Sequence, residues 1–125
     1  MRDKINDPAR LGLIKESIAN IETFLAETTS YEAFSGNKIL CHAVIYNLQC
    51  IGENVYRLSS EFIDSHPEVE WKTIEGLRHV LVHDYYAVNM ETIWNILQKD
   101  MPGLKSYLES LNPPATDAAV AQRLM

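Results

Sequence analysis

The sequence contains only two cysteines, Cys41 and Cys50, among its 125 residues. The apolar periodicity around them predicts a single helix, along which they would be about 13 Å apart, too far for a disulfide. Free thiols are typical of proteins that work in a reducing compartment. We therefore expect a cytoplasmic protein.

Long apolar runs are also missing. No stretch approaches the roughly 18 apolar residues that a membrane-spanning helix requires. Residues 1–18 intersperse charges along their length and lack the apolar core of a secretory signal. We expect a protein that neither crosses nor binds a membrane.

Basic residues are scarce: 11 lysines and arginines stand against 17 aspartates and glutamates, for a formal net charge of -6. Broad binding to long duplex DNA depends on neutralising many phosphates, so this balance argues against it. A small phosphate site built from a few basic side chains remains compatible with the composition.

The pattern that is present is helical, since neither strand alternation nor an internal repeat occurs. Helices are expected from an Asp7 N-cap and Pro8 to about Glu27, from about Asn37 to Leu58, from near Trp71, and over residues 93–108 with a break at Pro102. Connections are expected at residues 28–37, 59–68 and 87–89. The predicted fold is all-α, an antiparallel bundle of four or five helices, with residues 1–112 as one domain and 113–125 as a C-terminal tail.

One glycine interrupts the longest of these helices. The apolar residues of this helix repeat at helical spacing, namely Leu40, Val44, Leu48, Ile51, Val55 and Leu58. Gly52 lies among them, although glycine costs about 1 kcal/mol relative to alanine inside a helix. We therefore expect another backbone to approach closely at Gly52.

The stretch RHVLVHDYY, residues 78–86, places three basic side chains beside apolar ones. On a helical projection Arg78 borders the apolar face, and His79 and His83 lie one turn apart. In the simplest interpretation Arg78 extends to Glu75 or Asp84 and both histidines are surface residues. A second interpretation is a metal site, because histidines at i and i+4 can chelate one ion, but neither an HExxH nor a CxxC motif accompanies them.

A third interpretation is cleavage of RNA. Histidine has an unperturbed pKa close to neutrality, so it could take a proton from a ribose 2′-OH. Arginine could hold the phosphate with two hydrogen bonds. Such a site would use neither a metal nor a cofactor.

The same stretch resembles a known motif. Arg78, four residues, His83, one residue and Tyr85 match the R-x4-H-x-Y pattern of HEPN-domain proteins, specifically the HepT-like toxins encoded beside a minimal nucleotidyltransferase antitoxin. The segments IGENVYRLSSEFIDSHPEVEW and VNMETIWNIL resemble the helices that flank this motif in the family. The resemblance covers roughly residues 9–110. Asn54 departs from it, because a small residue usually follows the Gly-Glu pair.

The resemblance implies a metal-independent endoribonuclease toxin in which Arg78 binds the phosphate and His83 is the general base. His79 would add a phosphate contact or serve as the acid, and Asp84 would orient His83 or be only a solvated charge. Glu53 would be either a buried partner of an arginine such as Arg78 or a surface acid.

The resemblance also implies two protein partners. The first is a second copy of the chain, forming a homodimer with the motif residues at a shared cleft. The second is a cognate nucleotidyltransferase that transfers AMP to Tyr85, with Tyr86 as the alternative acceptor. A competing hypothesis is a non-catalytic helical subunit that docks such an enzyme and helps to bind its nucleotide.

The helical projection gives an independent reason for the dimer. Arg78 and His83 would be about 140° apart around one continuous helix and about 7.5 Å apart along its axis. On one continuous helix the two side chains would therefore be poorly placed to form a single site. Either the helix ends near His83, or a second subunit completes the site.

Overall fold

A computed structural model describes residues 6–83 and 89–111 of the chain. Every regular element in these two ranges is helical, as predicted for an all-α fold. In chain order they are α1 (Asp7–Phe24), α2 (Tyr31–Ser35), α3 (Lys38–Tyr56), α4 (Ser60–Ser65), α5 (Trp71–His83), α6 (Met90–Asn95), the π-helical turn η2 (Ile96–Asp100) and α7 (Met101–Ser110).

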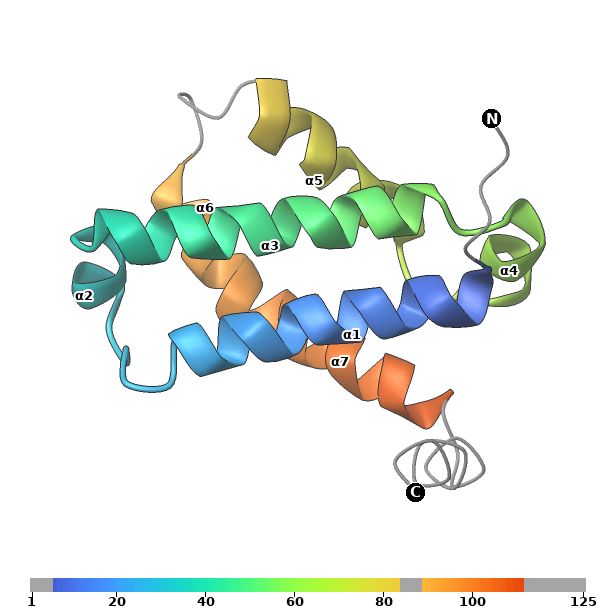
Figure 1. Ribbon diagram of the computed structural model, residues 1–125, viewed down its shortest axis with the longest axis horizontal. Coiled ribbons are helices and arrows are strands. Elements are labelled where there is room, and N and C mark those ends of the chain that lie inside the picture. The colour runs from blue at the N-terminus through green and yellow to red at the C-terminus, as the bar shows by residue number, and fades with distance from the viewer. Residues whose placement is uncertain (1–5, 84–88, 112–125) are drawn as a thin grey trace.

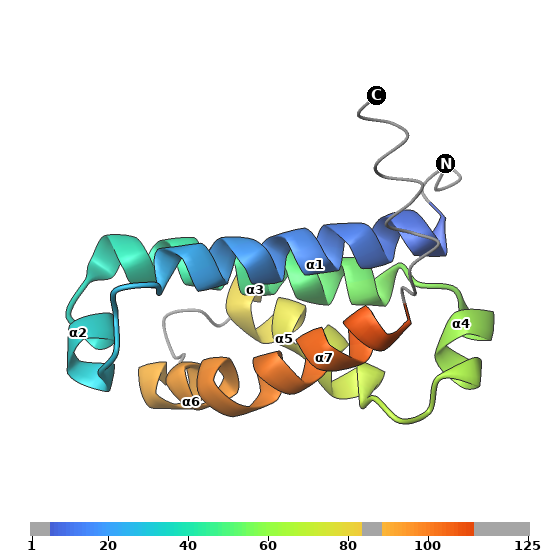
Figure 2. The ribbon, with the colours of Figure 1, turned by 90° about the horizontal axis from the view of Figure 1, so that it is seen from below.

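The helices form two layers. Helices α1 and α3 lie side by side and antiparallel in one layer (Figure 1), and α5, α6 and α7 lie behind them in the second (Figure 2). The short helices α2 and α4 close the two ends. The core between the layers includes the fully buried side chains Ile14, Ile18, Ile21, Phe34, Val44, Leu48, Leu81 and Leu108.

The residue that caps the start of helix α1 lies one position earlier than the sequence predicted. The N-cap is Asn6, whose side-chain oxygen accepts a hydrogen bond from the amide of Ala9 at 3.0 Å, so the prediction of an Asp7 cap is wrong. Asp7 instead accepts hydrogen bonds from the amide and hydroxyl of Ser59, at 2.9 and 2.6 Å. Since Ser59 is itself the N-cap of α4, Asp7 joins the starts of two helices.

Two segments expected as connections contain short helices. Ser30 caps α2 and Ser59 caps α4, each accepting a backbone amide three residues later. Such helices are too short to show an apolar period, so pattern analysis misses them. The predicted start of the next helix is confirmed, because Asn37 caps α3 through the amide of Leu40.

The predicted break near Pro102 is present, and it lies in the turn before the proline. Residues Ile96–Asp100 form the π-helical turn η2, and Pro102 falls in the first turn of α7. A proline lacks an amide proton and its ring crowds the carbonyl one turn earlier, which is why the widened turn precedes it.

Some expectations fall outside the described residues. These are the tail 113–125 and most of the connection at 87–89. Among the helices of residues 6–83 and 89–111, none is long and apolar enough to cross a membrane.

The close approach expected at Gly52 is confirmed. All six apolar residues of the α3 pattern are buried, and Gly52 is buried among them where α3 crosses α5. A Cβ added at Gly52 would lie 3.0 Å from both the Cβ and the amide nitrogen of Arg78, and 3.2 Å from the carbonyl oxygen of Ile74. Backbone atoms cannot move away cheaply, so the crossing requires glycine.

The variant Gly52→Ala should therefore unfold more easily, by about 1–3 kcal/mol, as is typical of overpacked interiors. Urea denaturation followed by circular dichroism measures this change. Gly76→Ala is the matched control, because an added Cβ there meets nothing within 4 Å and the helix gains propensity. Equal stability of the two alanine variants would contradict the role of Gly52.

Candidate functional site

The α3–α5 crossing determines where the side chain of Arg78 lies. Its backbone packs on Gly52, so the side chain leaves the crossing along the edge of α3, where it is 34% exposed. Its guanidinium lies over the ring of Tyr56, with 3.8 Å between the guanidinium carbon and the ring centroid. A cation over an aromatic face gains about 0.5–1 kcal/mol at a partly exposed site.

The carboxylate of Glu53 is shared between Arg78 and a second arginine. Glu53 Oε1 lies 3.7 Å from Arg78 Nη1, whereas Glu53 Oε2 accepts a hydrogen bond from Arg57 Nε at 2.8 Å. The predicted pairing of Glu53 with Arg78 is thus present as an ion pair, but Glu53 is 41% exposed and not buried. Pairs this exposed contribute only about 0.2–1 kcal/mol. The side chain of Arg78 is consequently held in place by weak interactions.

One donor of Arg78 has no acceptor within the part of the chain that the structure describes. Its Nε is buried and has no hydrogen-bond partner among the described residues. Buried donors are nearly always paired in folded proteins, so an unpaired one needs an explanation. An acceptor supplied by a ligand would satisfy it.

Gln49 ties the last described turn of α5 to α3. Its side-chain nitrogen donates to the carbonyl oxygen of Leu81 at 2.9 Å. Carbonyls in the last turn of a helix often lack an intrahelical partner, and a side chain from a neighbouring helix can supply one. This bond fixes the backbone two residues before His83.

A groove of about 520 Å³ runs beside Arg78 between α1, α3 and α5. Its lining comprises Arg10, Leu13, Tyr46, Gln49, Cys50, Glu53, Asn54 and Arg78. Asn54, the residue that departs from the family pattern, is buried and points toward α1, where its oxygen accepts from Arg10 Nη1 at 2.8 Å. It therefore leaves the Gly52 contact undisturbed.

The phenol of Tyr46 lies along the same groove. Its hydrogen bond with the thiol of Cys50, one turn further along α3, raises the pKa of Tyr46. Tyr46 stays neutral and 64% exposed on the outer surface of α3. Both cysteines lie on α3 as free thiols, as expected from their spacing.

Helix α5 carries three of the seven candidate residues named from the motif and its flanks. Arg78, His79 and His83 are on it, and Glu53 meets Arg78 from α3. The side chains of His79 and His83, and all of Asp84, Tyr85 and Tyr86, lie outside what the structure describes. Whether those residues join Arg78 therefore stays a prediction.

No group of three or more potential metal ligands occurs among the residues that the structure describes. The paired histidines of the alternative metal interpretation are not included in that statement, because their side chains are outside the description.

Sequence reasoning missed three neighbours of the site, namely Tyr56, Arg57 and Gln49. A signal for them existed in the spacing, because Gln49 and Tyr56 lie within four residues of Gly52 on α3 and Arg57 is the C-cap that follows. Had the partner helix been placed at Gly52, residues three before and four after it would have been expected near Arg78.

Two comparisons with known proteins agree on the family. A family model described as "Ribonuclease HepT-like" matches residues 14–111. The chain is 37% identical over 82 residues to "Putative RNase TTE0752" of Caldanaerobacter subterraneus subsp. tengcongensis, covering 66% of this chain and 73% of that protein. It is 35% identical over 98 residues to "Probable ribonuclease HepT" of Thermococcus cleftensis, covering 78% and 88%. It is 33% identical over 96 residues to "Putative RNase MJ1380" of Methanocaldococcus jannaschii, covering 77% and 87%.

No solved structure matches the chain significantly. The family model nonetheless spans α5 with its arginine and histidines, α3 with its Gly-Glu pair, and α6 and α7. The chain therefore belongs to the HepT-like ribonuclease family and is an endoribonuclease with a HEPN-like fold.

Proposed function

We propose that this endoribonuclease is the toxin of a toxin–antitoxin pair, acting on RNA in the cytoplasm through Arg78 and His83. The observation that carries the proposal is Arg78, a partly exposed guanidinium whose buried Nε has no partner among the described residues and whose ion pair with Glu53 is long, at 3.7 Å. An RNA phosphate would supply the missing acceptors, because guanidinium and phosphate pair through two parallel hydrogen bonds.

The reaction follows from the chemistry of RNA. His83 takes the proton of the 2′-OH, the 2′-oxygen attacks the adjacent phosphorus, and the bond to the 5′-oxygen of the next nucleotide breaks. The products are a 2′,3′-cyclic phosphate and a 5′-hydroxyl, whose proton comes from His79 or from water. Arg78 stabilises the charge that gathers on the phosphate oxygens, and Asp84 orients His83.

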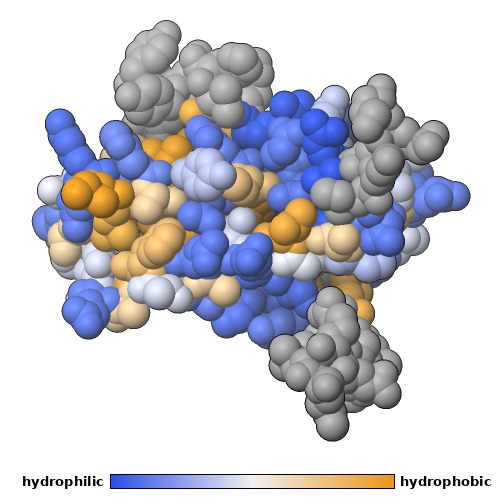
Figure 3. All heavy atoms as spheres, in the orientation of Figure 1, coloured by the Kyte–Doolittle hydropathy of each residue, from blue (hydrophilic) through white to orange (hydrophobic). Residues whose placement is uncertain are grey.

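A homodimer would complete the site. Large apolar side chains are exposed on α3 and α1, with Ile39 84%, Tyr46 64%, Tyr56 49% and Leu13 36% exposed. Figure 3 shows apolar patches over these two helices, and Tyr46 and Leu13 border the groove of Arg78. We call this set of four residues the outer stripe. A second copy that covers it would bring two Arg78 grooves to one interface.

Regulation would come from a nucleotidyltransferase antitoxin. It would transfer AMP from ATP to the hydroxyl of Tyr85 and release pyrophosphate. An AMP group two residues from His83 brings a phosphate that can occupy Arg78 and a base that blocks the groove to RNA.

The first test is RNA cleavage by the purified protein. Cleavage should persist in excess EDTA and leave 2′,3′-cyclic phosphate ends, and His83→Ala should lower the rate by about 10²–10⁴ while its circular dichroism stays unchanged. Arg78→Ala should lose activity and Arg57→Ala should not, although both remove a partner of Glu53. A parent protein that binds a nucleotidyltransferase but does not cut RNA would favour the docking subunit.

Assembly can be measured by sedimentation. A dimer near twice 14.2 kDa is expected at micromolar concentration. Tyr46→Glu should shift the protein toward monomer, because it introduces a charge into the outer stripe, whereas Ser106→Glu adds the same charge on the exposed surface of α7 and should not. A monomer with full activity would refute the shared cleft.

Modification can be followed by mass spectrometry with a purified nucleotidyltransferase and ATP. We expect one or more added AMP groups on the peptide that contains Tyr85, together with loss of RNA cleavage. Tyr85→Phe should remain active and escape silencing. If Tyr86→Phe escapes instead, the acceptor is Tyr86, and silencing of both without added mass would mean inhibition by binding alone.

A further inference from the structure

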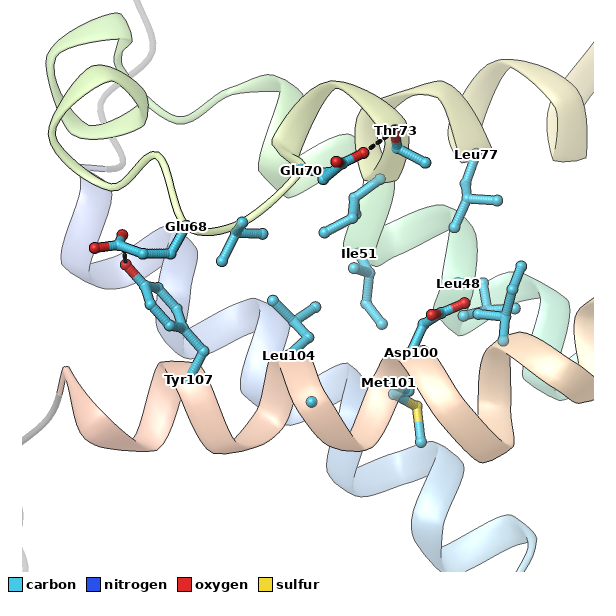
Figure 4. A pocket seen from close by; sticks show the side chains of 14 residues that line it. Leu48, Ile51, Glu68, Glu70, Thr73, Leu77, Asp100, Met101, Leu104 and Tyr107 are labelled. Atoms are coloured by element: carbon cyan, nitrogen blue, oxygen red, sulfur yellow. Dashed lines mark hydrogen bonds between the residues drawn. The ribbon is translucent and has the colours of Figure 1, made fainter.

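A second cavity, of about 500 Å³, lies on the other side of α5, between α5, α3, η2 and α7 (Figure 4). Its walls are mostly apolar, formed by Leu48, Ile51, Val69, Ile74, Leu77, Ile96, Met101, Leu104 and Tyr107. Cavities of about 300–1,000 Å³ with apolar walls and a few polar groups are typical of small-molecule sites. Arg78 and Glu53, the proposed site residues whose side chains the structure describes, do not line it.

The charged groups of this cavity are all of one sign. Glu68, Glu70 and Asp100 line it, and no lysine, arginine or histidine does so among the described residues. Glu68 accepts a hydrogen bond from the hydroxyl of Tyr107 at 2.7 Å, which lowers the pKa of Glu68 and keeps it ionised. Glu70 accepts from the hydroxyl of Thr73 at 3.3 Å.

Asp100 differs from the two glutamates. Its carboxylate makes no hydrogen bond or ion pair with any other residue that the structure describes, and it does not cap α7. The π-helical turn η2 ends at Asp100, and Figure 4 shows its carboxylate directed into the space between α7 and the opposite wall. Single π-turns are frequently found at functional sites, and here the turn brings Ile96 and Asp100 to one cavity.

We infer that this cavity binds a small organic cation, in which an ammonium group is carried on an apolar body. The apolar walls would bury the body, and Asp100 with Glu70 would pair with the ammonium group at the rim. An anionic ligand would meet three carboxylates without a compensating cation among the described residues, and a neutral one would form no ion pair with Asp100. The inference does not depend on the proposed RNA cleavage.

Three probes of similar shape test the charge preference: hexylamine, 1-hexanol and hexanoate. Their affinities can be measured by titration into the ¹⁵N-labelled protein at neutral pH, following amide chemical shifts. Hexylamine should bind at millimolar concentration and shift amides of α5, η2 and α7, 1-hexanol should bind more weakly, and hexanoate should not bind. No binding by hexylamine, or equal binding by 1-hexanol, overturns the inference.

Matched variants localise the binding. Asp100→Asn should weaken hexylamine binding by about two- to five-fold without changing 1-hexanol, as is typical for one exposed ion pair. Glu61→Gln is the control, since Glu61 is exposed on α4 and does not line the cavity. An equal effect of both variants would mean that hexylamine responds only to net charge, which would overturn the site.

A larger side chain at Gly103 would narrow the cavity. Gly103 lines the cavity, and a Cβ added there meets nothing within 4 Å, so a longer side chain has room to extend. Gly103→Met should abolish hexylamine binding, while Gly103→Ala, which preserves the helix, should retain it. Undiminished binding by Gly103→Met would place hexylamine elsewhere and refute the inference, whether or not the protein cleaves RNA.

Discussion

The contact between Gly52 of α3 and the backbone of Arg78 on α5 is the constraint on which the described part of the site depends. With only 3.0 Å available to an added Cβ, the two helices cross at one point and cannot slide past each other. The side chain of Arg78 can then leave only along the edge of α3. The residues that follow Gly52 on α3, Glu53 and Tyr56, become its neighbours because of that crossing. One small residue thus positions both the cation and its surroundings.

The charges at this crossing are arranged so that Arg78 is retained without being neutralised. Glu53 Oε2 accepts a hydrogen bond of 2.8 Å from Arg57, whereas Glu53 Oε1 lies 3.7 Å from Arg78 Nη1. Two arginines and one carboxylate give a local excess of positive charge in a chain whose formal net charge is -6. Because the interactions of Arg78 with Glu53 and Tyr56 are individually weak, a phosphate that offers two charge-assisted hydrogen bonds can replace them. An acidic protein can in this way hold a single phosphate.

The sequence was sufficient for the long helices because their apolar residues recur over several turns, as in α3 from Leu40 to Val55. It was insufficient where structure is shorter than that period, as in α2 and α4, or where two adjacent residues can each cap a helix, as Asn6 and Asp7 can. The motif identified Arg78, and the family pattern pointed to Glu53. The contributions of Tyr56 and Gln49 could be predicted only by first identifying the helix that crosses at Gly52, because a contact between helices depends on their crossing point as well as on spacing within each one.

Helix α5 separates two hollows of different chemistry. Arg78 borders the groove beside α1 and α3, whereas Ile74 and Leu77 line the acidic cavity toward α7. The helix packs far more extensively on α3 than on α7, and Gln49 adds a bond from α3 to its last described turn. Its position is therefore set from the α3 side. The cavity exists because α5 is incompletely packed on its α7 side, and the crossing with α3 does not depend on that side. Helix α5 can therefore present the cation of Arg78 to the groove and the apolar side chains of Ile74 and Leu77 to the cavity.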